Sequence, residues 1–423
     1  MMSPVHRPFV RLAGLLGLWF GLGLVLVLAP GVGVGGSAGG SVRAATTPTV
    51  HTVLGPGVVS APGGLALDAA GNLFVADTGH CRVLVVPARA GSLDGLRLRP
   101  GHPTVLAGSR CGAVGGIGAP SDVAVDGKDD VYIAEATAER VQKLPAGTHH
   151  VVTVAGTGEG GFENAQQIAT SSQLDQPTGV AVDAAGDLYI ADTANCMVRV
   201  LPAAGTTTFD GQPVAAGHLV TVAGTGVCGS QGQGGPVRTA QIWNPVAVAL
   251  DAAGDLLIAD NGDQSVLLAP AGAAASFAGT TVGAGDIGVV VGGTGSYGPY
   301  VADGLPANGP TAELNDLRGL AVGPDGVLVM TDGFMHVIRA VPASDETVFG
   351  KAMKSGDLYT IAGALPVSTP AGDNDGTRWV VTKMGTPVGV AVAPSRSLYF
   401  SDASANTVRM LPGPGAGWSS EAP

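Results

Sequence analysis

One stretch decides the fold of this chain: Pro177–Pro202, which reads PTGVAVDAAGDLYIADTANCMVRVLP. The same 26-residue pattern occurs six times without a gap, and successive copies begin 57 to 72 residues apart. The other copies are Pro62–Pro87, Pro120–Pro145, Pro245–Pro270, Leu317–Pro342 and Pro387–Pro412. Because a repeat of this size cannot bury a hydrophobic face alone, the six copies are expected to pack into one body.

Each copy has the pattern of three short strands. GVAVD and DLYIAD are apolar and β-branched runs separated by a turn rich in Asp, Ala and Gly, and Met197–Leu201 supplies the third strand. A separate motif of the type LVTVAG, at Leu219–Gly224, supplies a fourth strand. Six units of four antiparallel strands predict an all-β, six-bladed β-propeller.

The order of the motifs predicts how the ring closes. The sixth copy ends at Pro412 and no fourth-strand motif follows it. A matching motif, VHTVLG, stands at the other end of the repeats, at Val50–Gly55. We therefore expect the N-terminal strand to complete the last blade and close the propeller, which removes a free sheet edge.

The segment before the repeats has the pattern of an export signal. His6, Arg7 and Arg11 precede an apolar run over residues 12–29, which is nearly long enough to span a bilayer. Residues 1–30 are thus either a cleaved signal peptide or a signal anchor, and the protein is expected to be secreted or held at the cell surface. The expected organisation continues with a flexible linker over 31–48, the propeller over 49–412 and a tail over 413–423.

Composition limits the classes of partner. The formal net charge is −12, whereas a surface that binds nucleic acid is basic. The 68 Gly and 29 Pro residues recur in register with apolar runs, which is typical of tight turns between short strands. We expect a monomer with no nucleic-acid partner, no cofactor and no membrane contact beyond an uncleaved N-terminal segment.

The repeat resembles the NHL repeat family. Pro62–Pro87 and Pro177–Pro202 carry its proline, its GVAVD-like strand, its GNLYIAD-like hairpin and its third strand, and Thr153–Gly158 and Thr221–Gly226 carry TVAGTG. The likeness extends from about Thr49 to Pro412, and the fifth copy departs most from it. The family includes sensor-kinase ectodomains, a peptide-amidating lyase and RNA-binding propellers, so the resemblance implies a fold and not one activity.

Four cysteines follow the repeat. Cys81 and Cys196 occupy the same position in the first and third copies, and Cys111 and Cys228 each follow a fourth strand. Of the three possible connectivities, only Cys81–Cys111 with Cys196–Cys228 respects the repeat. Disulfides are expected in an exported chain, while a metal site would require short paired spacings that these cysteines do not have.

An acidic residue stands at the sixteenth position of every copy. One interpretation is a ring of carboxylates that holds a cation near the channel mouth. The other is a structural role in which each side chain accepts backbone N–H groups of the following turn. Recurrence in all six copies favours the structural role for Asp77, Glu135, Asp192, Asp260, Asp332 and Asp402.

The connections from each fourth strand to the next copy vary most. They contain the candidate ligand-binding residues Trp243, Tyr297, Tyr300, Arg378 and Trp379. We expect a non-catalytic binding module that recognises a protein, a peptide or a cell-envelope glycan through this loop face. The alternative is a metal-assisted lyase or hydrolase at the channel mouth, which requires several converging Asp, Glu, Asn or His side chains. The sequence itself supplies no catalytic or metal-binding residues for that alternative.

Overall fold

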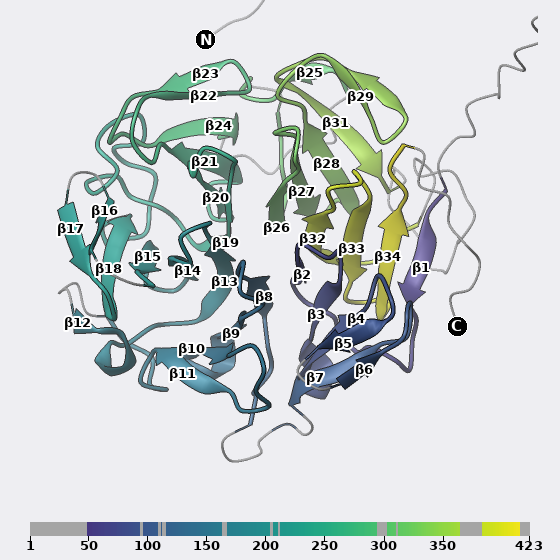
Figure 1. Cartoon of the computed structure of the whole chain (residues 1–423). Coiled ribbons are helices and arrows are strands. Elements are labelled where there is room, and N and C mark those ends of the chain that lie inside the picture. The colour runs from purple at the N-terminus through teal and green to yellow at the C-terminus, as the bar shows by residue number, and fades with distance from the viewer. Residues whose placement is uncertain are drawn as a thin grey trace, which may run out of the picture. The chain divides into compact units, whose positions relative to one another are not determined.

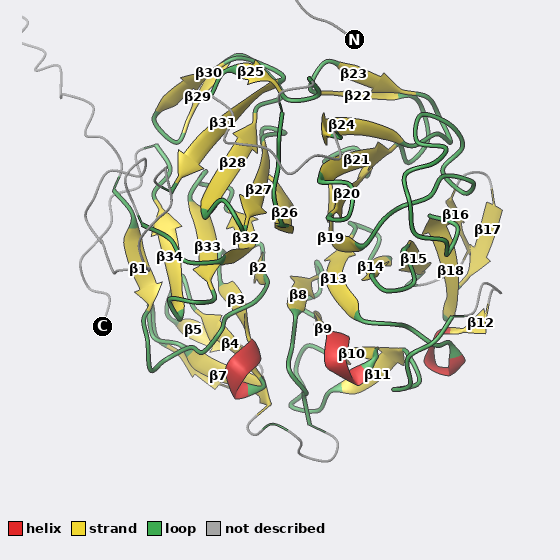
Figure 2. Cartoon of the chain, turned by 180° about the vertical axis from the view of Figure 1, so that it is seen from behind, coloured by secondary structure: helices red, strands yellow, loops and turns green. Residues whose placement is uncertain are grey.

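Short antiparallel strands arranged around one axis form the propeller predicted from the repeat (Figure 1). The computed structural model describes residues 49–93, 96–108, 111, 116–162, 167–203, 206–209, 212–293, 303–309, 312–363 and 383–414. The helices in these ranges are single 3-10 turns, coloured red in Figure 2: η1 (Thr78–His80), η2 (Ala136–Ala138) and η3 (Ala169–Ser171). None of them has the length or apolar character needed to cross a membrane.

Each blade is a four-stranded antiparallel sheet whose inner strand opens a copy of the repeat. The first three blades consist of β2 (Leu65–Leu67), β3 (Leu73–Asp77), β4 (Arg82–Val86) and β7 (Thr104–Gly108); β8 (Asp122–Val125), β9 (Val131–Glu135), β10 (Arg140–Leu144) and β11 (Val152–Ala155); and β13 (Pro177–Val182), β14 (Leu188–Asp192), β15 (Met197–Leu201) and β18 (His218–Ala223).

The remaining three blades follow the same order from the axis outward. They consist of β19 (Pro245–Leu250), β20 (Leu256–Asp260), β21 (Ser265–Ala269) and β24 (Gly288–Gly292); β26 (Leu317–Val322), β27 (Leu328–Asp332), β28 (Val337–Val341) and β31 (Asp357–Ala362); and β32 (Pro387–Val392), β33 (Leu398–Asp402), β34 (Thr407–Leu411) and β1 (His51–Leu54).

The outer strand of the sixth blade comes from the N-terminal side of the described chain. β1 pairs antiparallel with β34, with His51 opposite Met410 and Leu54 opposite Val408. The pairing predicted for this strand is therefore observed. Where the sixth blade meets the first, the Ser401 hydroxyl donates to the Gly63 carbonyl at 2.7 Å.

Shorter strands decorate the blade edges. Four hairpins connect third and fourth strands: β5 (Gly91–Leu93) with β6 (Leu96–Leu98), β16 (Thr206–Phe209) with β17 (Gln212–Ala215), β22 (Ala275–Phe277) with β23 (Thr280–Val282), and β29 (Glu346–Val348) with β30 (Lys351–Met353). β12 (Gln167–Ile168) and β25 (Leu305–Pro306) add a fifth strand to the third and fifth blades. The positive φ of 77° at Gly279 and 76° at Gly350 gives two of these hairpins the tight turn that glycine permits.

The hydrophobic core lies between neighbouring blades. One cluster joins Phe74 of the first blade to Ile133 of the second, and another joins Ala134 of the second to Ile190 of the third. These residues are fully buried and most of their neighbours are Val, Leu and Ala, which pack closely on pleated surfaces. The blades therefore stabilise one another, as a repeat that cannot fold singly must.

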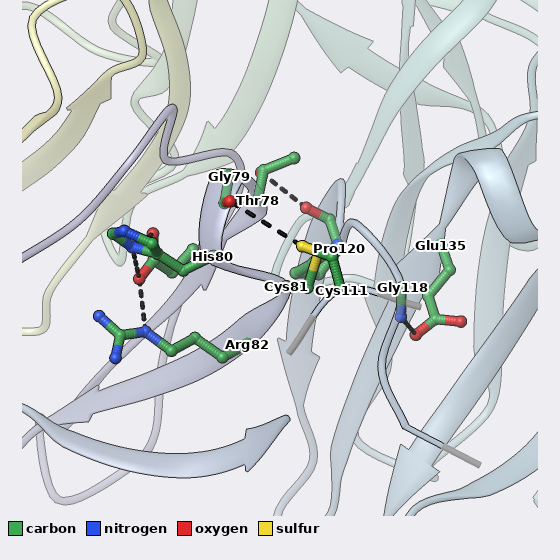
Figure 3. The surroundings of a disulfide bond; sticks show 10 residues. Thr78, Gly79, His80, Cys81, Arg82, Cys111, Gly118, Pro120 and Glu135 are labelled. Carbon is green, nitrogen blue, oxygen red and sulfur yellow. Dashed lines mark hydrogen bonds and ion pairs between the residues drawn. A yellow bond between two sulfur atoms is a disulfide. The ribbon is translucent and has the colours of Figure 1, made fainter. Parts of the chain in front are cut away.

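Both predicted disulfides are present, each within one blade. Cys81 bonds Cys111 with a Cα–Cα distance of 5.0 Å, and Cys196 bonds Cys228 at 5.2 Å. Figure 3 shows the first of them beside the β3–β4 turn, where Thr78 donates to the Pro120 carbonyl of the next blade. Loops of 30 and 32 residues correspond to about 3–4 kcal/mol of stabilisation each.

Candidate functional site

The inner strands of all six blades begin at the same end of the propeller, and we call this end the loop face. Because the strands of a blade are antiparallel, the turns between second and third strands and the connections between blades lie at this same end. The turns of the loop face are residues 78–81, 136–139, 193–196, 261–264, 333–336 and 403–406.

A cavity of about 420 Å³ opens on the loop face at the axis of the propeller. All six blades line it, and we call it the channel-mouth cavity. Its volume lies in the range of small-molecule sites. The lining residues used below are Leu65, Asp122, Thr178, Val248, Asn261, Asp316, Arg318, Leu320 and Val390.

Glycine holds the inner strands close together around this cavity. The third position of the repeat faces the backbone of the next blade, so a β-carbon at Gly179 would lie 2.7 Å from the Val246 carbonyl oxygen. At Gly389 it would lie 2.8 Å from the Gly64 Cα. Both distances are far inside van der Waals contact, so only very small residues suit this position in most blades.

Asp122 breaks this pattern in the second blade. The other copies have Gly64, Gly179, Ala247, Gly319 and Gly389 at the same position. The Asp122 carboxylate accepts the Val123 N–H and, across the blade junction, the Val180 N–H, both at 2.9 Å. Burial raises the pKa of the Asp122 carboxyl to about 7, and these two hydrogen bonds oppose the shift only in part.

The fifth blade contributes the charged groups on another wall of the cavity. The Arg318 Nε donates to the Asp316 carboxylate at 2.7 Å, and the Asn261 side chain donates to the other Asp316 oxygen at 3.3 Å. The Asp316 N–H donates to the Gln264 side chain at 2.7 Å. The charges of Arg318 and Asp316 thus neutralise each other on this wall.

The six acidic residues of the repeat are anchors for the loop face. Each is buried, and each accepts the backbone N–H of the residue 17 positions earlier, in the connection that precedes its blade. The donor and acceptor pairs are Ser60 with Asp77, Gly118 with Glu135, Asp175 with Asp192, Trp243 with Asp260, Asn315 with Asp332 and Gly385 with Asp402.

The structural role expected for these carboxylates is thus observed, with one correction. The principal N–H donor lies in the preceding connection, while bonds from the following turn are added at Asp332 and Asp402 by Met335 and Ala405. The reason is geometric, because the end of the second strand lies beside the start of its own inner strand. The anchors therefore fix the root of every connection on the loop face.

Asp260 is the anchor without an arginine in its own blade. Ser265 and Leu267 stand where other blades place Arg82 or Arg199, which pair with Asp77 and Asp192 respectively. Burial first, and then the neighbouring Asp263 carboxylate, raise the pKa of Asp260 to about 8. Burial also raises the pKa of Asp192 and of Asp332, to about 6 in each case.

We expect the pKa of Asp260 to make stability depend on pH. A carboxyl whose pKa is higher in the folded state than in the unfolded state stabilises the folded protein fully at any pH below its unfolded pKa. This contribution is lost as the pH rises through the folded pKa of about 8. Asp260→Asn should therefore flatten the fall in unfolding free energy between about pH 4 and about pH 8, where one such group contributes up to about 1.4 kcal/mol per pH unit. Urea unfolding across this range measures it. The exposed Asp345→Asn is the control, and an unchanged slope in Asp260→Asn would contradict the assignment.

A second hollow of about 470 Å³ lies on the loop face beside the Cys196–Cys228 disulfide. Trp243 and Gln264 line it, and it shares Asn261 and Asp316 with the channel-mouth cavity. The Trp243 side chain lies against Gly262, where a β-carbon would sit 2.7 Å from the Trp243 Cβ, and 51% of Trp243 is exposed. A glycine in the turn thus lets this indole rest on the backbone with a large part of its surface in solvent.

Most of the exposed large apolar side chains among the described residues lie on the loop face. The described residues include eight large apolar side chains that are exposed, and five of them lie on connections or turns of this face. Phe334 in the β27–β28 turn is 70% exposed, the highest value among them. The five are Val58, Phe162, Val227, Trp243 and Phe334.

The candidate binding residues from the sequence have different outcomes. Trp243 lies on the loop face with about half of its surface exposed, and its role in binding stays a prediction. Tyr297, Tyr300, Arg378 and Trp379 lie outside the described residues.

Sequence reasoning missed Asp122 and Phe334, although a signal for both exists. Asp122 is the one acidic residue at the third position of the six copies, and Phe334 is the one aromatic residue at the eighteenth. Departures from a repeat, which mark individual blades, locate the candidate site better than the residues that all copies share.

The metal-assisted alternative needs ligands that converge. Within the described ranges, no group of three His, Cys, Asp or Glu side chains is arranged to hold a metal ion. His80, next to the first disulfide in Figure 3, instead contacts the Asp77 anchor at 2.9 Å.

Comparison with known proteins agrees with the repeat assignment. The sequence profile of the NHL repeat matches residues 60–86 and 174–201. A stretch of 132 residues, 28% of this chain, is 29% identical to the protein SUPPRESSOR OF QUENCHING 1, chloroplastic, of Arabidopsis thaliana. The match spans 12% of that protein.

Solved structures share the architecture at low identity. A protein of unknown function from Bacteroides thetaiotaomicron VPI-5482 aligns with a TM-score of 0.56 at 15% identity, over 86% of this chain and 75% of that chain. An auxiliary nutrient binding protein from the same organism aligns with a TM-score of 0.53 at 12% identity over the same shares. These similarities establish a common fold.

Proposed function

The chain is a six-bladed β-propeller built from NHL repeats, and from that premise we propose that it is an exported, non-catalytic binding module whose loop face captures a protein or peptide. The observation that carries the proposal is that five of the eight exposed large apolar side chains among the described residues lie on that face. Exposed apolar groups on connections that a rigid scaffold holds in place are typical of recognition surfaces.

The anchoring of the connections supports the same function. Buried carboxylates fix the root of each connection, and a disulfide begins two of them. A connection that is already ordered loses less conformational entropy when a partner binds, so more of the contact energy remains as affinity. The two disulfides also indicate an extracellular or periplasmic location.

The chemistry of the exposed groups favours a protein or peptide over a glycan. Phe162, Val227 and Phe334 have no polar atom in their side chains, and apolar side chains of a partner would cover them best. A structural neighbour described as an auxiliary nutrient binding protein adds that this fold serves ligand capture elsewhere.

We expect Trp243→Ala combined with Phe334→Ala to weaken peptide binding at least about tenfold, because two exposed anchors lose their contacts. The probe is a set of peptides selected from a random display library on the immobilised native protein, with affinities measured by calorimetry. Stability should change by less than about 1 kcal/mol, since both side chains are largely in solvent.

Val105→Ala combined with Val152→Ala is the matched control, because both residues are exposed apolar groups on outer strands away from the loop face. Equal losses in the two double variants would contradict the assignment of the face. Glycan binding that depends on Trp243, in the absence of any selected peptide, would replace the peptide with a glycan as the ligand.

A further inference from the structure

The channel-mouth cavity has a feature that peptide recognition by the loop face does not use. Asp122 is the only acidic residue at a repeat position that the other copies fill with Gly or Ala. An ionisable group in one blade of a symmetric ring is a departure that packing does not require. The departure makes Asp122 one of the residues that line the cavity.

The carboxylate is fixed in place by its surroundings. One oxygen accepts the Val123 N–H and the other accepts the Val180 N–H, both at 2.9 Å. Gly64 of the neighbouring blade makes the space, because a β-carbon there would lie 2.9 Å from the Asp122 Cα and collide with the carboxylate. A carboxylate offers about four acceptor positions, so acceptor capacity remains for a ligand.

No basic side chain neutralises Asp122 within the described chain. Ionisable groups on the strands packed around it are Asp77 at the end of β3, and Tyr132 and Glu135 on β9, while β2 and β13 carry none. Arg82 pairs with Asp77 at 2.7 Å, and Arg140 pairs with Glu135 at 2.6 Å.

The other charged groups lining the cavity also neutralise each other. Arg318 pairs with Asp316 on the wall formed by the fifth blade. When Asp122 is ionised, its negative charge is therefore the uncompensated charge of the cavity. A buried negative charge of this kind is stabilised by a bound cation.

We propose that the channel-mouth cavity binds a small organic cation, a primary ammonium group with an apolar body, and that Asp122 is its counter-ion. Leu65, Val248, Leu320 and Val390 supply apolar walls for the body of such a ligand. An ammonium group has three N–H donors, and an ionised carboxylate is a strong acceptor for such a donor. Calcium would instead need six to eight oxygen ligands, for which one carboxylate is a poor beginning.

The ionisation of Asp122 provides a signature of this site. Only the carboxylate form attracts a cation, and the pKa of Asp122 is raised to about 7. Affinity should therefore fall as the pH falls below about 7, by up to about tenfold per pH unit. Near neutral pH, binding should release a proton, because the bound ammonium lowers the pKa of the carboxyl.

Titration calorimetry of the full chain with hexylamine tests the proposal, with hexanol as the uncharged analogue and calcium chloride as the metal arm. At about pH 8 we expect hexylammonium to bind at least about tenfold more tightly than hexanol, with calcium weaker than both. Heats measured in buffers of different ionisation enthalpy should reveal proton release near pH 7.

Asp122→Gly restores the residue that four sister blades use, so it should fold, and it should abolish the preference for hexylammonium and the proton release. Asp122→Asn keeps the shape and removes the charge, and it decides the matter if the glycine variant unfolds. Absence of hexylammonium binding by the native protein, equal affinity for hexanol, tighter binding of calcium, or an unchanged preference in both variants would each overturn the proposal.

The proposal of an ammonium site can be tested separately from the proposed function. Trp243→Ala combined with Phe334→Ala should leave the hexylammonium affinity unchanged, because neither residue lines the channel-mouth cavity. Loss of ammonium binding in that double variant would mean that the charge of Asp122 does not act alone in the site, and would overturn its role as the counter-ion.

Discussion

Removing residues 1–56 should lower the free energy of unfolding by about 5 kcal/mol. The deletion removes Val50 and Leu54, whose side chains are completely or almost completely buried in the core. Burial of each side chain contributes about 1.5–3 kcal/mol to the free energy of unfolding. The deletion also removes the strand that pairs with β34 and leaves a free sheet edge in the sixth blade. The melting temperature should fall by roughly 10 °C.

Two shorter deletions are the controls for this experiment. Removing 1–48 leaves β1 in place, and removing 415–423 leaves every described strand in place. Both should melt close to the full chain in differential scanning calorimetry. If the protein without 1–56 melts within a degree or two of them, the N-terminal strand contributes little to closing the propeller.

The fold was predictable because its signals recur. Six copies of one pattern give the number of blades, and a misplaced LVTVAG-type motif gives the origin of the outer strand in the sixth blade. The disulfides followed from the same logic, since Cys81 and Cys196 share a repeat position that faces the end of a fourth strand. Regular patterning of this kind specifies the architecture through burial alone.

The candidate site was predictable only in part because a site depends on what the repeat does not share. The connection that carries Trp243 was recognised from its aromatic residue. The role of Asp122 depends on Gly64 and Val180 of the two adjoining blades, which the ring brings beside it. No spacing along the chain expresses that juxtaposition. The raised pKa of Asp122 likewise results from burial in the assembled ring.

The glycines at the third repeat position predict the second large effect. In Gly319→Ala the new β-carbon would collide with the carbonyl oxygen of Val388 in the next blade. The obstructing atom belongs to the backbone of an inner strand and cannot rotate away. The fifth and sixth blades would have to move apart, which would also lengthen the bond from the Thr331 hydroxyl to the Val388 carbonyl, now 2.9 Å.

We therefore expect Gly319→Ala to destabilise the protein by about 3 kcal/mol or more in urea unfolding, which is at the upper end for overpacking. Gly272→Ala is the matched control. A β-carbon at Gly272 meets no atom within 4 Å and the backbone there has no positive φ, so alanine should be neutral or slightly stabilising. Equal stability of the two variants would show that neighbouring inner strands have room to adjust. Ala247 is the natural alanine at this position in the fourth blade, so the junction there has room for a methyl group. Ala247→Gly should cost about 1–2 kcal/mol, from the loss of one buried methyl group and from the greater backbone freedom of glycine. The contrast between these sites would then measure how tightly each pair of blades is joined around the channel-mouth cavity.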